Sequence, residues 1–253
     1  MLTQIINGHI LTPQGWLKDG SVLINDGKIL EVTNSDLAVI GAKVIDAKGM
    51  FIVPGFVSMH SHGGGGKDFT EATPEAFGTI VNAHLKHGAT SIFPTLSSTS
   101  FDVVRQAVAT CEEMMQRPES TILGLHIEGP YLNRKMAGAQ WGDFLKDPDP
   151  NEYIPLLEST GCIKRWDISP ELPGAHDFAR YTSGHGILTA ITHTEAEYPE
   201  IKAAFEAGFT HAAHFYNAMP GFHKRREYKY EGTVESVYLM DGMTVEVIAD
   251  GVH

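Results

Sequence analysis

Two histidines close an apolar stretch of the chain and are the first residues with a clear capacity for chemistry. His60 and His62 end the segment FIVPGFVSMHSH, two positions apart. Residues two apart on a β-strand project from the same face, so both imidazoles can point at one ion. Histidine nitrogens are common ligands of divalent metals, although two loop histidines facing solvent would show the same spacing. The pair therefore needs partners elsewhere in the chain to define a metal site.

Three further residues repeat this placement at the ends of other apolar segments. Glu128 ends ILGLHIE, His193 ends ILTAITH, and His214 lies in THAAHFYN. A buried strand-end carboxylate is costly unless a cation or a basic residue compensates it. Imidazoles together with a carboxylate suit zinc or another first-row divalent ion that keeps open positions for water. The sequence therefore predicts a divalent metal site that draws its ligands from several strand ends.

The elements that must position these residues alternate between strands and helices. Seven apolar segments predict strands, and they are FIVPGFVSMH, ATSIFPTLS, ILGLHIEG, IKRWDIS, ILTAITH, THAAHFYN and MTVEVIADG. Helices are predicted after the capping residues Thr73 and Ser100, and in EYPEIKAAFEAG. Such alternation gives an α/β fold with a parallel sheet, either open or closed as a (β/α)8 TIM-type barrel. The barrel is favoured because no dinucleotide-binding glycine motif follows a strand, and because similar polar residues recur at strand ends.

The two ends of the chain complete the predicted domain organisation. Residues 1–50 predict short strands, with a hairpin at Asp26-Gly27, that form an incomplete small β-sandwich. Residues 51–253 are expected to form the barrel. Because the chain stops at His253 after the seventh strand, we expect a barrel that lacks its eighth strand. Open strand edges predict that these residues alone are poorly stable or prone to aggregate.

Composition excludes several classes of partner. The formal net charge of −12 argues against nucleic acid and anionic membranes, which would repel the protein. The amino terminus lacks a signal peptide, and no apolar run approaches about 18 residues. The two cysteines, Cys111 and Cys162, lie far apart and predict neither a disulfide framework nor a thiolate zinc site. A cytoplasmic protein is expected.

The segments that carry the candidate ligands resemble one family. PGFVSMHSHGGGGKDF, GLHIEGPYLN, ITHT, HFYNAMPGF and ADGVH occur in the order and spacing of the N-acetylglucosamine-6-phosphate deacetylases, within the amidohydrolase superfamily. The resemblance covers essentially the whole chain, and the combination of HIEGPYLN with HFYNAM is specific. It implies metal-dependent hydrolysis of the acetamido group of N-acetylglucosamine 6-phosphate, which yields glucosamine 6-phosphate and acetate.

The resemblance also implies which residues bind metal. Glu128, His193 and His214 match the primary metal ligands of the family. His60 and His62 match a pair that can hold a second ion, and some members lack this pair. The site is therefore expected to hold one or two divalent ions, with zinc or iron as the best candidates.

Further positions match substrate contacts in the family. Asn217 and Ala218 match residues that hold the sugar phosphate, and His253 matches the histidine that contacts the acetamido carbonyl. Arg225 or Arg226 falls where an arginine reaches the phosphate bound by the neighbouring subunit, which implies a homodimer. Independently, HKRREYK is the only dense basic run in this acidic chain, and guanidinium groups suit phosphate. A solvated loop would have the same composition.

Two departures from the family pattern affect the predicted chemistry. Gln140 stands where the family often has a substrate-binding histidine, and we expect the amide to bind substrate in its place. The general base of the family is an aspartate after the eighth strand, expected beyond the end of this chain. Two other functions stay open: an amidohydrolase acting on a cyclic amide or amine, and a non-catalytic remnant that binds metal or sugar phosphate.

Overall fold

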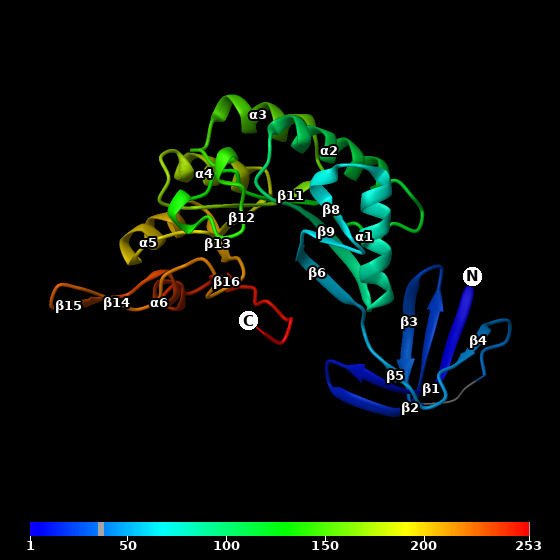
Figure 1. The fold of residues 1–253 in the computed structure, drawn as a ribbon. Coiled ribbons are helices and arrows are strands. Elements are labelled where there is room, and N and C mark those ends of the chain that lie inside the picture. The colour runs from blue at the N-terminus through cyan, green and yellow to red at the C-terminus, as the bar shows by residue number, and fades with distance from the viewer. Residues whose placement is uncertain (35–37, 253) are drawn as a thin grey trace. The chain divides into compact units, whose positions relative to one another are not determined.

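The computed structural model describes residues 1–34 and 38–252, so the predicted substrate contact His253 lies outside the described residues. The chain divides into two compact units, Met1–Phe56 and Val57–His253 (Figure 1). All five predicted metal ligands belong to the second unit.

Among its described residues, the first unit is a small sheet of five strands. Its strand order is β3-β2-β1-β4, and β5 also pairs with β1. The strands are β1 (Leu2–Thr12), β2 (Gly15–Asn25), β3 (Lys28–Thr33), β4 (Lys43–Asp46) and β5 (Phe51–Ile52). Asp26 and Gly27 join the antiparallel β2 and β3 with φ angles of 47° and 78°. Positive φ at both central residues is what a two-residue type I′ turn requires, so the predicted hairpin is confirmed.

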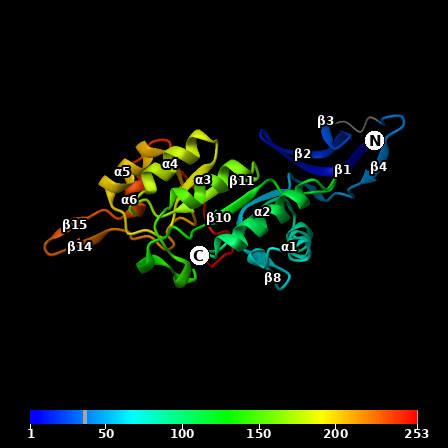
Figure 2. The ribbon, with the colours of Figure 1, turned by 90° about the horizontal axis from the view of Figure 1, so that it is seen from above.

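The second unit is built on a curled sheet of seven strands (Figures 1 and 2). Its order is β16-β13-β12-β11-β10-β9-β6, and every pair from β9 to β16 is parallel. The strands are β6 (Phe56–Ser61), β9 (Ala89–Leu96), β10 (Leu125–Glu128), β11 (Ile163–Ile168), β12 (Leu188–Ile191), β13 (Phe209–Ala212) and β16 (Thr244–Val245). All seven predicted strands are present. Within the described ranges β6 and β16 are the two edges, so the sheet is an open part of a TIM-type barrel, as predicted.

In the part of the chain that the structure describes, six α-helices accompany the strands. They are α1 (Pro74–Lys86), α2 (Phe101–Met115), α3 (Pro150–Ser159), α4 (Ala175–Gly184), α5 (Tyr198–Ala207) and α6 (Thr233–Tyr238). The hydroxyls of Thr73 and Ser100 cap α1 and α2, and Gly208 ends α5 with a φ of 115°. These three helices were predicted. The sequence prediction missed α3, α4 and α6, although Asp149-Pro150 is a normal helix start and the Asp149 side chain caps α3.

Two small hairpins and three short 3-10 helices follow strand ends. They are β7 (Gly63–Gly64) with β8 (Lys67–Asp68), β14 (His223–Arg225) with β15 (Tyr228–Tyr230), η1 (Phe69–Glu71), η2 (Arg134–Met136) and η3 (Gly142–Phe144). The glycine run after His62 forms the turn of the first hairpin, where a Cβ on Gly63 would clash with the backbone oxygen of Lys67. Glycine is needed there for close backbone approach.

An apolar core lies between the helices and the sheet of the second unit. Phe77 and Ile80 of α1 and Val104 of α2 are buried in it, together with Trp166 of β11. The Trp166 ring stacks on Tyr131 at 5.7 Å with an interplanar angle of 7°. This packing holds in place the strands whose carboxyl ends carry the candidate ligands. Within the described residues, no helix has the length and apolar character needed to cross a bilayer.

Candidate metal centre

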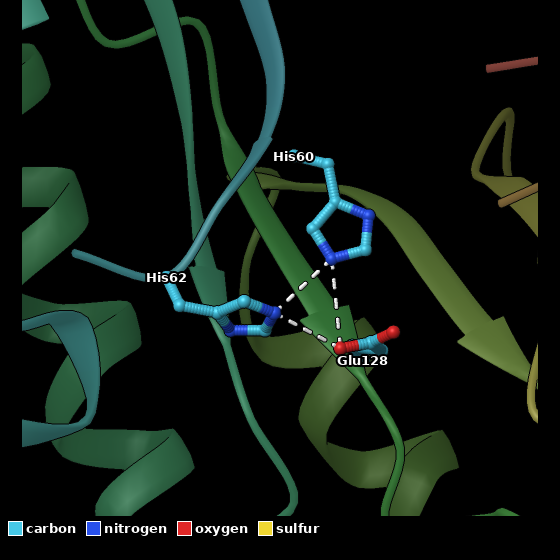
Figure 3. A group of neighbouring side chains, drawn as sticks. All are labelled: His60, His62 and Glu128. Carbon is cyan, nitrogen blue, oxygen red and sulfur yellow. Dashed lines mark hydrogen bonds and ion pairs between the residues drawn. The ribbon is translucent and has the colours of Figure 1, made fainter. Parts of the chain in front are cut away.

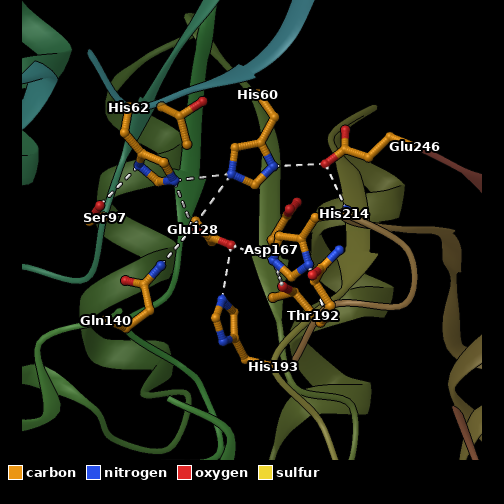
Figure 4. Close-up of polar contacts among 12 residues, drawn as sticks. His60, His62, Ser97, Glu128, Gln140, Asp167, Thr192, His193, His214 and Glu246 are labelled. Atoms are coloured by element: carbon orange, nitrogen blue, oxygen red, sulfur yellow. Dashed lines mark hydrogen bonds and ion pairs between the residues drawn. The ribbon is translucent and has the colours of Figure 1, made fainter. Parts of the chain in front are cut away.

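The side chain of Glu128 is the centre of the candidate site. It ends β10, and only 2% of its surface is exposed. Its Oε1 lies 2.9 Å from Nε2 of His214 and 3.2 Å from Nε2 of His193. Its Oε2 lies 3.0 Å from Nε2 of His62 and 3.5 Å from Nε2 of His60 (Figure 4). One carboxylate therefore joins two pairs of imidazoles.

The first pair, His193 and His214, presents Nε2 lone pairs to Glu128. Nδ1 of His193 lies 2.7 Å from the backbone oxygen of Met136, and Nδ1 of His214 lies 3.1 Å from that of Asn217. A carbonyl oxygen only accepts hydrogen bonds, so each Nδ1 carries the proton. In the neutral rings Nε2 is then an acceptor facing a carboxylate, an arrangement that a cation between them would stabilise.

The second pair, His60 and His62, lies across the same carboxylate. Their Nε2 atoms are 3.1 Å apart and both face Oε2 of Glu128 (Figure 3). Nδ1 of His60 lies 2.7 Å from Oε1 of Glu246, and Nδ1 of His62 lies 2.9 Å from the hydroxyl of Ser97. The two imidazoles thus point at one place, as their spacing on the strand predicts.

The donor set fits a divalent metal. Two groups that contain Glu128 bring their ligand atoms within 4.8 Å of one another: Glu128 with His193 and His214, and Glu128 with His60 and His62. Neutral imidazoles and one shared carboxylate are the ligands that zinc and other first-row divalent ions prefer. Each group could hold one ion, with Glu128 contributing one oxygen to each.

The pKa values of these groups have directions that follow from the same contacts. Burial raises the pKa of Glu128, but hydrogen bonds from His193, His214 and the other two imidazoles outweigh burial and hold it well below its usual range. Burial lowers the pKa of His60, yet its contacts with Glu128 and Glu246 raise it overall to about 10. The site therefore attracts positive charge, and protons and metal ions compete for the same nitrogens.

Unusual backbone conformations occur where the first pair leaves its strands. His193, His214, Tyr216 and Ala218 have φ angles of 44°, 28°, 78° and 52°. Non-glycine residues rarely adopt the left-handed region, and such strain gathers at functional sites. The backbone turns sharply at both histidines and aims their side chains at Glu128.

Gln140, which the sequence predicts to bind substrate, contacts the carboxylate of Glu128. Its Nε2 donates to Oε2 of Glu128 at 2.6 Å, and its Oε1 accepts from the backbone N–H of Ser98 at 2.7 Å. Both ends of the amide are thus used within the chain, and Figure 4 shows the contact with Glu128.

Asn217 and Ala218 lie in the turn that holds His214. The backbone oxygen of Asn217 accepts from Nδ1 of His214, and the backbone oxygen of Ala218 accepts from the N–H of Thr194, next to His193, at 3.0 Å. These two predicted substrate contacts therefore belong to the same loop as the candidate ligand His214.

The basic run forms the β14–β15 hairpin. Arg225 donates to Oε2 of Glu197 at 2.8 Å and lies over the ring of Tyr230, 3.9 Å from its centroid. Arg226 begins the two-residue turn at the tip, is exposed, and has a φ of 55°. The two adjacent arginines thus differ: Arg225 is held by its own chain, and Arg226 stands at the tip.

The sequence prediction missed a layer of charged side chains next to the ligands. Arg165 and Asp167 of β11 and Glu246 after β16 are joined by ion pairs. The signal that singled out Glu128, a charged residue within an apolar strand, is also present in IKRWDIS and MTVEVIADG. Asp167 also lies near His60 and His126 as a third possible ligand group, but Arg165 already supplies the positive charge there.

The fold and the site together define a class of protein. The chain belongs to the amidohydrolase family, whose model matches residues 51–253. This family implies a divalent metal, and the residues gathered around Glu128 could hold one.

Particular relatives are similar along the whole chain. An N-acetylglucosamine-6-phosphate deacetylase of Lysinibacillus sphaericus is 30% identical over 98% of this chain and 64% of its own length. An N-acetylgalactosamine-6-phosphate deacetylase of Escherichia coli O157:H7 is 27% identical over 100% of this chain and 66% of its own. The crystal structure of an N-acetylglucosamine-6-phosphate deacetylase from Pasteurella multocida superposes with a TM-score of 0.92 at 25% identity, covering 100% of this chain and 66% of that one. The chain thus spans about two thirds of the length of these relatives.

Proposed function

We propose that the protein hydrolyses the acetamido group of N-acetylglucosamine 6-phosphate, releasing acetate and glucosamine 6-phosphate. The observation that carries the proposal is the arrangement of Glu128 between two pairs of imidazoles at the ends of parallel strands, where barrel enzymes place their sites. The similarity to deacetylases of N-acetylated hexosamine phosphates supports this choice of substrate.

The proposed cofactor is a pair of divalent ions, with zinc or iron as the candidates. Imidazole nitrogen with carboxylate oxygen suits both metals, and the two groups of ligands support two ions. Glu128, His193 and His214 would hold the first ion, and His60 and His62 with the other oxygen of Glu128 would hold the second. When bound, such ions supply the Lewis acidity that brings the pKa of water toward about 7.

The proposed reaction adds water to the acetamido carbonyl carbon, breaks the C–N bond and returns a proton to the amine. Asn217 and Ala218 would orient the sugar phosphate beside His214, because their turn is tied to that ligand. His253, on the resemblance, would contact the acetamido carbonyl. The proton carrier implied by the resemblance is an aspartate after an eighth strand, and we assign no described residue to that role.

Recognition of the phosphate is proposed for the β14–β15 hairpin. Arg225 and Arg226 stand at and near its tip, and guanidinium groups bind phosphate through paired hydrogen bonds. We propose a homodimer in which this hairpin of one subunit binds the substrate phosphate in the site of the other. We also propose that the protein is cytoplasmic.

N-acetylgalactosamine 6-phosphate is a second candidate substrate. The similarity to the Escherichia coli deacetylase favours it, and the two sugars differ only in configuration at C4.

A substrate panel tests the proposal on the full-length protein. Acetate release would be measured with both sugar phosphates, with unphosphorylated N-acetylglucosamine and with a cyclic amide. We expect the highest kcat/KM for N-acetylglucosamine 6-phosphate, loss of activity with chelator, and recovery with a divalent ion. Hydrolysis of the cyclic amide in preference to every sugar, or acetate release that withstands chelation, would overturn the proposal.

A further inference from the structure

Glu246 lies directly after β16 and is fixed by its backbone. Its N–H donates to the backbone oxygen of Ala212 at 3.1 Å, and its own oxygen accepts from the N–H of Phe215 at 2.8 Å. These bonds extend the parallel pairing of β16 with β13, so the side chain starts from a defined position. Only 14% of that side chain is exposed.

One oxygen of Glu246 receives donors from both halves of the metal centre. Oε1 lies 2.7 Å from Nδ1 of His60 and accepts from the backbone N–H of His214 at 3.1 Å. The same atom accepts from Nη2 of Arg165 at 3.0 Å. Glu246 therefore contacts the side chain of one ligand and the main chain of another (Figure 4).

Arg165 holds this carboxylate in place. The guanidinium is 3% exposed and donates to Oε2 of Glu246 through Nη1 at 2.5 Å. It also forms a bidentate pair with Asp167, through Nε at 2.7 Å and Nη2 at 2.5 Å. A planar guanidinium between two carboxylates restrains both of them more closely than a lysine would. One positive and two negative charges leave net negative charge beside His60.

The layer continues into the neighbouring strands. Oδ2 of Asp167 lies 3.0 Å from Nε2 of His126, whose Nδ1 lies 3.0 Å from the hydroxyl of Thr95. That hydroxyl also accepts from the backbone N–H of Ser61, between the two histidines of the second pair, at 2.9 Å. A continuous series of contacts thus links His60 of β6 to Glu246 after β16, and then to residues of β11, β10 and β9. The last contact, from Thr95 of β9, is to the backbone of Ser61 in β6.

The two histidines of the second pair differ in how their tautomers are fixed. A carboxylate only accepts hydrogen bonds, so Glu246 requires a proton on Nδ1 of His60. In the neutral ring, the form that binds metal, the Nε2 lone pair then faces Glu128. The hydroxyl of Ser97, the partner of His62, can donate or accept and sets no such requirement. Within the second pair, therefore, only the tautomer of His60 is fixed by its hydrogen-bond partner.

We propose that Glu246, anchored by Arg165, is a positioning residue that presents Nε2 of His60 as a metal ligand and thereby allows the second divalent ion to bind. The inference rests on the proposed metal-dependent function, but it concerns ion binding and requires no substrate. Carboxylates behind metal-binding histidines typically contribute about 10- to 100-fold to metal affinity.

The experiment is a zinc titration of the metal-free, full-length protein by calorimetry, with bound zinc checked by elemental analysis. Glu246→Ala removes the acceptor of His60, while Arg165 keeps its pair with Asp167. Glu246→Gln retains one oxygen that can face Nδ1 of His60. Glu235→Ala is the matched control, because Glu235 accepts from the backbone N–H groups of Phe222 and Gly232 and contacts no candidate ligand.

Wild-type protein and Glu235→Ala are expected to bind two zinc ions. Glu246→Ala is expected to bind the first with affinity changed by less than about threefold and the second about 10- to 100-fold more weakly. Glu246→Gln should recover part of the loss, and it also replaces the alanine variant if that variant does not fold. In a His60→Asn background, Glu246→Ala should have no further effect, because its action runs through His60.

Three results would overturn the inference: wild-type protein that binds a single ion, Glu246 variants with an unchanged second affinity, or equal weakening of both steps. A protein that binds two ions in the expected manner but releases no acetate would refute the proposed function and leave this inference standing.

Discussion

Nε2 of His214 lies 2.9 Å from Oε1 of Glu128, while Nδ1 of the same ring faces the backbone oxygen of Asn217 at 3.1 Å. The carbonyl fixes the proton on Nδ1, so a neutral ring directs its lone pair at a carboxylate oxygen. Two acceptors at this distance need positive charge between them. A proton or a metal ion can supply that charge, and the arrangement of four such imidazoles around one buried carboxylate favours a divalent metal.

Replacement of Glu128 by Gln should remove both ions. The amide keeps one oxygen and places an NH₂ group where the other carboxylate oxygen faces an imidazole pair. Loss of a ligand should cost more than loss of a residue behind one, so acetate release should fall at least about 100-fold. Metal content and kcat of the purified variant are the measurements. A Glu128→Gln protein that keeps two ions and wild-type activity would show that Glu128 is not a metal ligand.

Replacement of Gln140 by Ala separates two roles for this residue. Its Nε2 donates to Oε2 of Glu128 at 2.6 Å, so the variant should bind divalent ions about 10-fold more weakly, with KM changed less than ion affinity. Ion titration and steady-state kinetics on one preparation give both numbers. A raised KM with unchanged ion affinity would instead favour the substrate-binding role predicted from the sequence.

The stability of the fold should depend on pH through His126. Burial lowers the pKa of this histidine to about 4, against the opposing effect of Asp167. A group with a lowered folded pKa binds its proton more readily in the unfolded chain, whose histidine pKa is about 6.5. His126 should therefore contribute a loss of stability on the order of 2 kcal/mol as pH falls from 7 to 5, while His60, whose pKa is raised, acts in the opposite direction.

The measurement is the free energy of unfolding of the full-length, metal-free protein at pH 7 and at pH 5. His126→Gln should show a smaller loss than wild type, because glutamine does not titrate. His185→Gln, at the exposed end of α4, should retain the wild-type dependence. Equal losses in wild type and His126→Gln would contradict the assignment.

The β14–β15 hairpin should affect substrate binding and leave metal binding unchanged. Replacing Arg225 and Arg226 together by Ala should raise KM for the sugar phosphate about 10-fold or more, because charge-assisted hydrogen bonds to phosphate are lost. KM for unphosphorylated N-acetylglucosamine should change little. Lys224→Ala is the control, since Lys224 pairs with exposed Glu227. An equal rise in KM for both sugars would show that the two arginines do not act through the phosphate group.

Local patterns in the sequence predicted much of the fold. Thr73 and Ser100 cap helices through bonds to residues three positions along, and Asp26-Gly27 turns a hairpin through its own backbone angles. Such features depend on a few neighbouring residues and are visible in a string of letters. The helix α6 was missed because it is short and begins at Gly232, which offers no side-chain cap.

The ion pairs of Arg165 with Asp167 and Glu246, next to the candidate ligands, could not be predicted in the same way. Arg165 and Glu246 are 81 positions apart, and their contact depends on the order of strands in the sheet. The candidate ligands could be predicted because each one lies at or near the end of an apolar segment. The contact of Gln140 with Glu128 depends on how the loop after β10 folds back over the strand end, which no local pattern specifies.

Elemental analysis of the full-length protein shows whether Glu128 and the four histidines around it bind divalent metal. The measurement is the number of divalent ions per chain, in wild type and in a variant carrying His60→Asn and His62→Asn. We predict two ions in wild type and one in the variant, because Glu128, His193 and His214 remain as ligands. A wild-type protein that holds no stoichiometric divalent ion, or a variant with the same metal content as wild type, would show that these residues do not form the proposed two-ion site.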